Sequence, residues 1–104
     1  MLHHVSLGTA DLPRARSFYD PVMAELGLRR TPDVDEAIGY GAGITVFSLN
    51  RPANGLPALA GNGVHVAFEV ERRAAVDAFY RAALAHGGTD AGAPGLRPEY
   101  DANY

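Results

Sequence analysis

The sequence predicts an α+β protein of one domain, in which a unit of one strand, one helix and a three-stranded meander occurs twice, with the second copy incomplete. Three observations predict this fold. The 104 residues suit a single domain with one core. Strand-like and helix-like periodicities alternate along the chain. The two halves also match at one constant shift of 61 positions, without a gap.

The first strand and the first helix are predicted from the amino-terminal residues. Apolar and β-branched residues over Leu2–Thr9 indicate a short strand. Asp11 can cap a helix and Pro13 suits its first turn, while Gly27 is placed to end it. Pro21 removes one hydrogen bond inside this helix, so we expect a kink or a break just before it, near Tyr19 and Asp20. The apolar positions of this helix are Ala15, Phe18, Tyr19, Val22, Met23 and Leu26.

Short segments separated by turn residues follow the first helix. The spacing predicts a meander with strands over Leu28–Thr31, Glu36–Tyr40 and Ile44–Leu49. Residues 1–50 would then form the first module. Residues 51–62 contain prolines and glycines without periodicity, which indicates a linker.

The second module is expected over residues 63–104. Val64–Val70 alternates as a strand does, and Glu71–His86 shows the apolar spacing of an amphipathic helix. Gly87 and Gly88 are placed to end that helix. The remaining tail, 89–104, is rich in glycine and proline and offers one short strand at most.

The repeat is the most informative feature of the sequence. Two matching strand–helix units could arise by chance, but a duplication explains why several matches share one shift. The closing strand of the second module would lie beyond Tyr104. The chain is therefore truncated, or a second copy supplies the missing edge in a homodimer, or the sheet edge stays open. The matching pairs are His4-Val5 with His65-Val66, Phe18-Tyr19 with Phe79-Tyr80, Met23 with Leu84, and Gly27 with Gly88.

Composition excludes several classes of function. The net charge is −3 and all nine basic residues are dispersed arginines, so the chain lacks the basic patch that nucleic-acid binding needs. It has no cysteine, which excludes disulfides and thiolate metal sites. The sequence shows neither a signal peptide nor a membrane span, so we expect no membrane partner and a cytoplasmic location.

The motifs resemble those of the vicinal-oxygen-chelate superfamily, which includes glyoxalases, bleomycin-resistance proteins and extradiol dioxygenases. This resemblance covers almost the whole chain and implies paired βαβββ modules that form a curled mixed sheet, a half-barrel with a divalent metal ion inside. The motifs that carry the resemblance are His4–Leu7, Ala10–Leu12, Ser17–Tyr19, Leu26–Leu28 and Gly63–Phe68.

The resemblance also implies metal ligands. In the superfamily each module contributes a histidine from its first strand and a carboxylate from its last, so His4 and His65 match the histidine positions for Zn, Ni, Mn or Fe. The segment 43–50 should hold the first carboxylate, yet it contains no acid. Glu99 and Asp101 are the nearby acids that could substitute. With two histidines alone, half of a tetrahedral shell would be missing.

Four further residues are candidates for a substrate pocket. Tyr40 and Phe47 lie on the meander, where they could line the concave side of the sheet or simply fill the core. Arg97 and Tyr100 lie in the tail, where relatives close their pocket, and an arginine there could bind an anionic substrate through paired hydrogen bonds. His3 would face away from His4 on a strand.

Two functions of different classes follow from the resemblance. The first is a metal-dependent lyase, isomerase or dioxygenase that acts on a small molecule in the cup of the sheet. The alternative is a metal-free protein that binds or sequesters a small molecule, of the bleomycin-resistance type, and the acid-free segment Ile44–Asn50 favours it. A third hypothesis is that the chain is a non-functional fragment, because the closing strand of the second module is missing.

Overall fold

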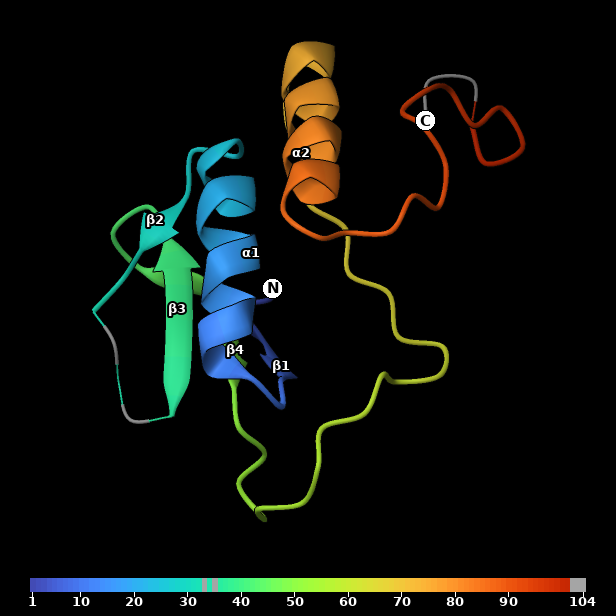
Figure 1. Ribbon diagram of the computed structural model, residues 1–104. Coiled ribbons are helices and arrows are strands. Elements are labelled where there is room, and N and C mark those ends of the chain that lie inside the picture. The colour runs from blue at the N-terminus through green and yellow to red at the C-terminus, as the bar shows by residue number, and fades with distance from the viewer. Residues whose placement is uncertain (33, 35, 102–104) are drawn as a thin grey trace.

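A strand, a helix and three more strands form the first half of the chain, and a long connection leads to a second helix (Figure 1). The computed structural model describes residues 1–32, 34 and 36–101. The elements are β1 (Val5–Gly8), α1 (Leu12–Ala24), β2 (Arg29–Arg30), β3 (Ala37–Gly41), β4 (Thr45–Asn50) and α2 (Arg73–Ala85).

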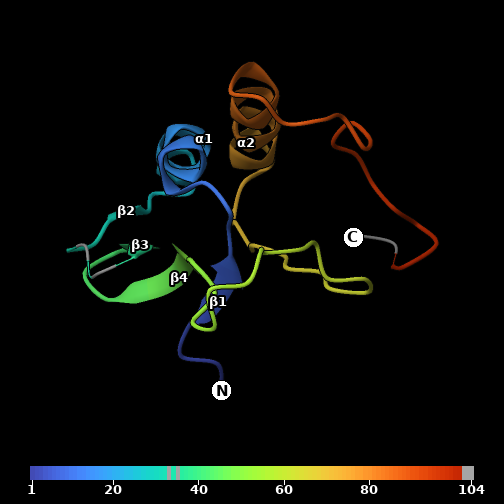
Figure 2. The ribbon, with the colours of Figure 1, turned by 60° about the horizontal axis from the view of Figure 1, so that its bottom comes forward.

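The four strands form one mixed sheet in the order β1-β4-β3-β2. β1 runs parallel to β4, whereas β2, β3 and β4 are joined antiparallel as a meander. Both helices lie on one side of this sheet (Figure 2). The predicted α+β class, the mixed sheet and the first βαβββ module are confirmed. The sheet is open, as a half-barrel would be, and the described residues of the second half add no strand to it.

The core lies between α1 and the sheet. Alternate residues of β3 and β4 point toward the helix, as the two-residue period of a strand requires. The side chains on this inner face and on the facing side of α1 are almost fully buried. The buried apolar residues are Ala15, Val22, Met23, Ile38, Tyr40, Phe47 and Leu49.

α1 begins with the predicted cap at Asp11, but it does not break at Pro21 as predicted. Asp11 caps the helix by accepting a hydrogen bond from the backbone N–H of Arg14 at 3.0 Å. The helix continues through Pro21 to Ala24 without the break that the proline led us to expect. Val22, next to the proline, is fully buried, and this packing offsets the lost backbone hydrogen bond.

The end of α1 is a Schellman turn. Gly27 adopts a left-handed backbone with φ of 75°, as predicted. The N–H of Leu28 donates a hydrogen bond to the carbonyl of Met23 at 3.0 Å, and the N–H of Gly27 donates one to the carbonyl of Ala24, also at 3.0 Å. The turn redirects the chain into β2 and so sets where the meander begins.

Replacing Gly27 with alanine is expected to lower the free energy of unfolding by about 1–2 kcal/mol, because a Cβ is strained in a left-handed backbone. Urea denaturation would measure the loss. Gly27→Asn is the matched control, since asparagine tolerates this conformation better. Equal losses in both variants would contradict this explanation.

The bounds of the two helices agree with the predicted repeat, but the predicted match of Gly27 with Gly88 is wrong. α1 and α2 each have 13 residues, and their bounds differ by the predicted 61 positions. However, the left-handed residue that ends α2 is Gly87, with φ of 109°, and not Gly88. The N–H of Gly88 instead donates to the carbonyl of Ala83 at 2.7 Å, as the N–H of Leu28 does to the carbonyl of Met23 in the first turn. The left-handed glycine therefore follows the end of α2 one residue sooner than it follows the end of α1.

The predicted strand over Val64–Val70 is wrong. This segment is extended and its burial alternates, with Val66, Phe68 and Val70 half-buried, but it forms no ladder with any described strand. The alternation predicts which side chains face the core, whereas a strand also needs a neighbouring backbone to pair with. Likewise, the first strand begins at Val5 and not at Leu2, since only Val5–Gly8 pairs with β4.

Within the described ranges, no helix has the length and apolar character that crossing a membrane requires.

Candidate ligand-binding site

A pocket of about 350 Å³ lies on the face of the sheet that α1 does not cover. Gly39 and Ser48 belong to this outer face, because each alternates along its strand with the buried residues Ile38, Phe47 and Leu49. The lining combines imidazole and hydroxyl groups with small apolar side chains. The residues that line it are His3, His4, Thr31, Pro32, Val34, Ala37, Gly39, Ile44, Thr45 and Ser48.

A pair of threonine hydroxyls forms one wall of this sheet-face pocket. Thr31 Oγ1 and Thr45 Oγ1 are 2.6 Å apart and share a hydrogen bond. A Cβ on Gly39 would lie 2.6 Å from Thr31 Oγ1, so only glycine lets the two hydroxyls meet across the strand. The shift in register between Tyr40 and Gly41 brings Thr45 opposite Gly41. Each hydroxyl keeps capacity for a further hydrogen bond to a ligand.

The two amino-terminal histidines lie together at the same pocket. Their Nδ1 atoms are 2.9 Å apart, and the rings meet edge to face. The expectation that His3 and His4 face opposite sides is wrong, because both precede β1 and the alternation of a strand does not apply to them. Beside the pocket, Ser6 Oγ and Ser48 Oγ join β1 to β4 at 2.6 Å.

Tyr40 and Phe47, predicted as pocket residues, lie on the other face of the sheet. Both are buried against α1, with 1% and 2% of their surface exposed. The Tyr40 hydroxyl donates a hydrogen bond to Asp20 Oδ1 at 2.7 Å. Burial and this carboxylate raise the pKa of Tyr40 well above its ordinary value. Neither residue lines the sheet-face pocket, although Phe47 lines a separate apolar cavity.

Arg97 and Tyr100 lie in the tail beyond α2 and do not line the sheet-face pocket either. The guanidinium of Arg97 donates to the carbonyls of Ala93 and Gly95, at 2.8 and 3.1 Å, and so holds its own loop together. The side chain of Tyr100 is exposed. The structure therefore does not bring the four predicted pocket residues together.

The predicted metal ligands are also not gathered in one place. His65 is exposed on the extended segment before α2, and no described pocket contains both His65 and His4. Among the described residues, no group of three or more histidine, cysteine or acidic side chains could hold a metal ion. The side chains that line the sheet-face pocket include no carboxylate among these residues. Among the described residues the pocket offers two imidazoles, which are half of a tetrahedral shell, and the role of His4 and His65 as ligands stays a prediction.

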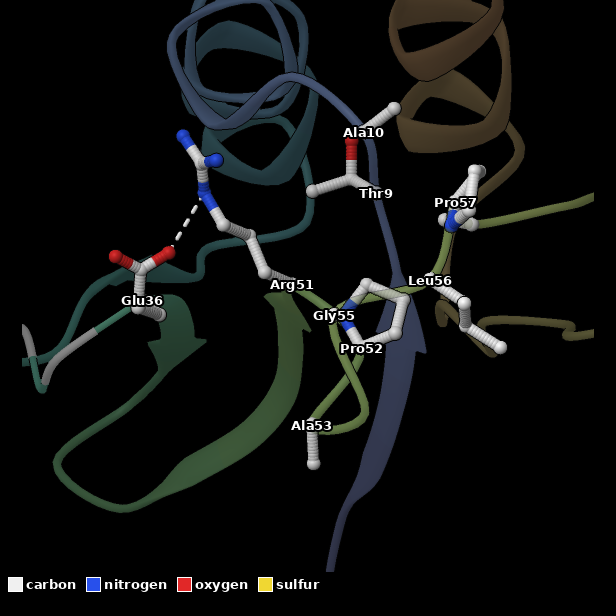
Figure 3. A pocket seen from close by; sticks show the side chains of 10 residues that line it. Thr9, Ala10, Glu36, Arg51, Pro52, Ala53, Gly55, Leu56 and Pro57 are labelled. Atoms are coloured by element: carbon white, nitrogen blue, oxygen red, sulfur yellow. Dashed lines mark ion pairs between the residues drawn. The ribbon is translucent and has the colours of Figure 1, made fainter.

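A second pocket, of about 570 Å³, lies where β1 and β4 end (Figure 3). Arg51 and Glu36 form an ion pair in its lining, with Arg51 Nε 2.6 Å from Glu36 Oε2. Sequence reasoning missed this pair, because only the register of β3 with β4 brings the two residues together. Both side chains are more than half exposed and their charges cancel, so the pair offers a charged ligand little net attraction.

The fold defines the class of the protein as α+β, with a βαβββ sheet that is covered by helices on one face and carries hydrogen-bonding groups on the other. The family model of the glyoxalase/bleomycin resistance protein/dioxygenase superfamily matches residues 1–103, and the chain belongs to this superfamily. The resemblance inferred from the paired motifs is thereby confirmed.

A solved structure agrees with this assignment. The chain is similar to a glyoxalase/bleomycin resistance protein from Albidiferax ferrireducens T118, at 33% sequence identity and a TM-score of 0.83. The match covers 90% of this chain and 76% of that one. Comparison with curated proteins gives no match.

Proposed function

We propose that this protein binds a small, oxygen-rich organic molecule in the sheet-face pocket without a metal ion, as a binding or sequestering member of its superfamily. One observation carries the proposal: the Thr31–Thr45 hydroxyl pair and the His3–His4 pair line one pocket. The acid-free segment 44–50 supports the absence of a metal ion from the proposed function. Hydroxyls and imidazoles can both donate and accept hydrogen bonds, which suits a ligand with several oxygen atoms.

The size of the pocket limits the ligand. A volume of about 350 Å³ is near the lower end of the roughly 300–1,000 Å³ typical of small-molecule sites. A metabolite-sized molecule fits this space, whereas a ligand as large as bleomycin would enter with one part only. The apolar side chains of Val34 and Ile44 at the pocket would contact the carbon skeleton of the ligand.

The test is a thermal-shift screen of hydroxy- and oxo-acids, phenols and bleomycin, in the presence of EDTA, followed by calorimetry on each hit. A bound ligand raises the melting temperature in proportion to its occupancy. The variant Thr45→Val with Ser48→Ala removes two hydroxyls from the pocket, and we expect it to weaken binding by about tenfold, at roughly 0.5–1.5 kcal/mol for each hydrogen bond.

Thr9→Val is the matched control for this variant. It removes a threonine hydroxyl from the pocket of Figure 3 instead, and binding should remain within about twofold of the wild type. Binding that both variants weaken equally would place the ligand elsewhere on the protein.

A metal-dependent reaction is the second candidate, and the adjacent imidazoles of His3 and His4 favour it. In that case His4, with His65 if the segment before α2 moves, would hold Zn, Ni, Mn or Fe. Loss of every ligand-induced shift in EDTA would support this candidate over the first. Calorimetric titration of these metals into the wild type and the His4→Ala, His65→Ala double variant would then identify the ligands.

A further inference from the structure

An apolar cavity of about 590 Å³ lies on the other side of the sheet, between the first half of the chain and α2. α1 and α2 lie side by side there (Figures 1 and 2). Leu7 and Phe47 form its floor on the sheet, and the extended segment before α2 forms a wall through Val64, Val66 and Val70. Both halves of the chain therefore build this cavity.

Aromatic rings run through the cavity wall as a continuous series. The ring of Phe47 lies 5.4 Å from that of Tyr19 and 5.2 Å from that of Phe68, between centroids. Phe68 in turn is 6.4 Å from Phe79 on α2. These separations are typical of interacting aromatic pairs, and a further flat ring placed among them would make the same kind of contact.

The second helix leaves part of its apolar face uncovered at this cavity. No residue of α2 is fully buried, and Val76, which lines the cavity, is 42% exposed. This space is open to solvent on one side, whereas apolar side chains inside a domain are normally packed to the density of organic crystals. The described side chains do not complete the packing around Phe68 and Phe79.

The chemistry of the lining selects an uncharged ligand. Among the described residues that line the cavity, none is charged, and the hydroxyl of Tyr19 is the one polar side-chain group. A charged molecule would lose its hydration there without gaining a partner. Burial raises the pKa of Tyr19, so its hydroxyl stays protonated.

We propose that this cavity is a second binding site, on the face of the sheet opposite to the hydroxyl-lined pocket, and that it takes one uncharged aromatic molecule. Phe47, Phe68 and Phe79 contact the faces and edges of its rings, and Tyr19 offers one polar group. The site is independent of the proposed function, because the two pockets share no residue.

The probe for the test is N-phenyl-1-naphthylamine, an uncharged aromatic dye whose fluorescence rises in apolar surroundings. Titration of the intact chain is expected to show saturable binding of one dye molecule per protein. Val66→Phe fills part of the cavity and should weaken binding at least tenfold. Val46→Phe, the same change on β4 outside both pockets, should leave the affinity within twofold of the wild type.

A second measurement covers the case in which Val66→Phe does not fold. Nuclear Overhauser effects between the dye and the rings of Phe68 and Phe79 in the wild-type protein are expected from the cavity geometry. Absence of saturable binding, equal affinity in both valine variants, or contacts to other residues would overturn the proposal. Dye binding should also be measured at increasing protein concentration. If the protein self-associates and the dye no longer binds, a second copy of the chain occupies the cavity, and the proposal is overturned.

Discussion

Truncation of Phe47 to alanine is expected to cost about 3–5 kcal/mol of the free energy of unfolding, the range for a buried phenylalanine. Phe47 is 2% exposed, and it is the residue at which α1, the sheet and the second half of the chain meet. Its ring contacts Tyr19 on α1 and Phe68 on the segment before α2. Because domains of this size are marginally stable, such a loss would unfold a large fraction of the protein.

Urea denaturation followed by circular dichroism would measure this effect. Val46→Ala is the matched control, since Val46 is the neighbouring β4 residue and its side chain is 40% exposed on the other face. We expect it to cost less than about 1 kcal/mol. A similar loss in both variants would mean that Phe47 does not join the two halves as the ring contacts indicate.

The first half of the fold could be predicted because its signals are local. Asp11 at the helix start and Gly27 at its end each act through backbone groups within a few residues, and the structure uses both as predicted. Each end of the three meander strands lies within one residue of its expected bound, because turn residues separate the strands. Local signals were misleading at Pro21, where the burial of Val22 and Met23 outweighs the cost of the proline.

The second half was predicted less well because its structure depends on neighbours. Val64–Val70 has the alternation of a strand, but hydrogen bonding to another strand is a property of the whole fold and not of the segment. The amphipathic pattern of α2 gave the correct helix, since that signal is contained in the helix itself.

The candidate site shows the same distinction. His4 was identified from a motif, and it does lie at the sheet-face pocket. The pairing of Thr31 with Thr45 was missed, because it requires the shift in register between β3 and β4 together with the open space at Gly39. Tyr40 was expected in a pocket, yet the strand alternation alone does not say which of the two faces α1 would cover.

Stability above pH 10 provides a test of the buried contact between α1 and β3. The Tyr40 hydroxyl is buried and donates to Asp20, which raises the pKa of Tyr40 above that of an unfolded tyrosine, about 10. Below pH 10 the Tyr40 hydroxyl is protonated in both states, so this group causes no change of stability with pH there. Above pH 10 the unfolded chain releases the proton while the folded chain keeps it, so stability falls by about 1.4 kcal/mol for each pH unit.

The composition allows the dependence of stability on pH above pH 10 to be assigned to tyrosines. The chain has no lysine and no cysteine, and arginine stays charged throughout, so tyrosines dominate titration in this range. Tyr40→Phe removes the hydroxyl. It should cost about 1–2 kcal/mol at pH 8 through the lost hydrogen bond, and the difference from the wild type should disappear as the pH rises from 10 toward 12.

Urea denaturation at several pH values measures both slopes, and Tyr100→Phe, at an exposed side chain, serves as the control that should follow the wild type. Burial also raises the pKa of Tyr19, so part of the slope remains in Tyr40→Phe. If the wild type and Tyr40→Phe lose stability in parallel above pH 10, the Tyr40 hydroxyl is open to solvent, and α1 does not pack on β3 through Asp20.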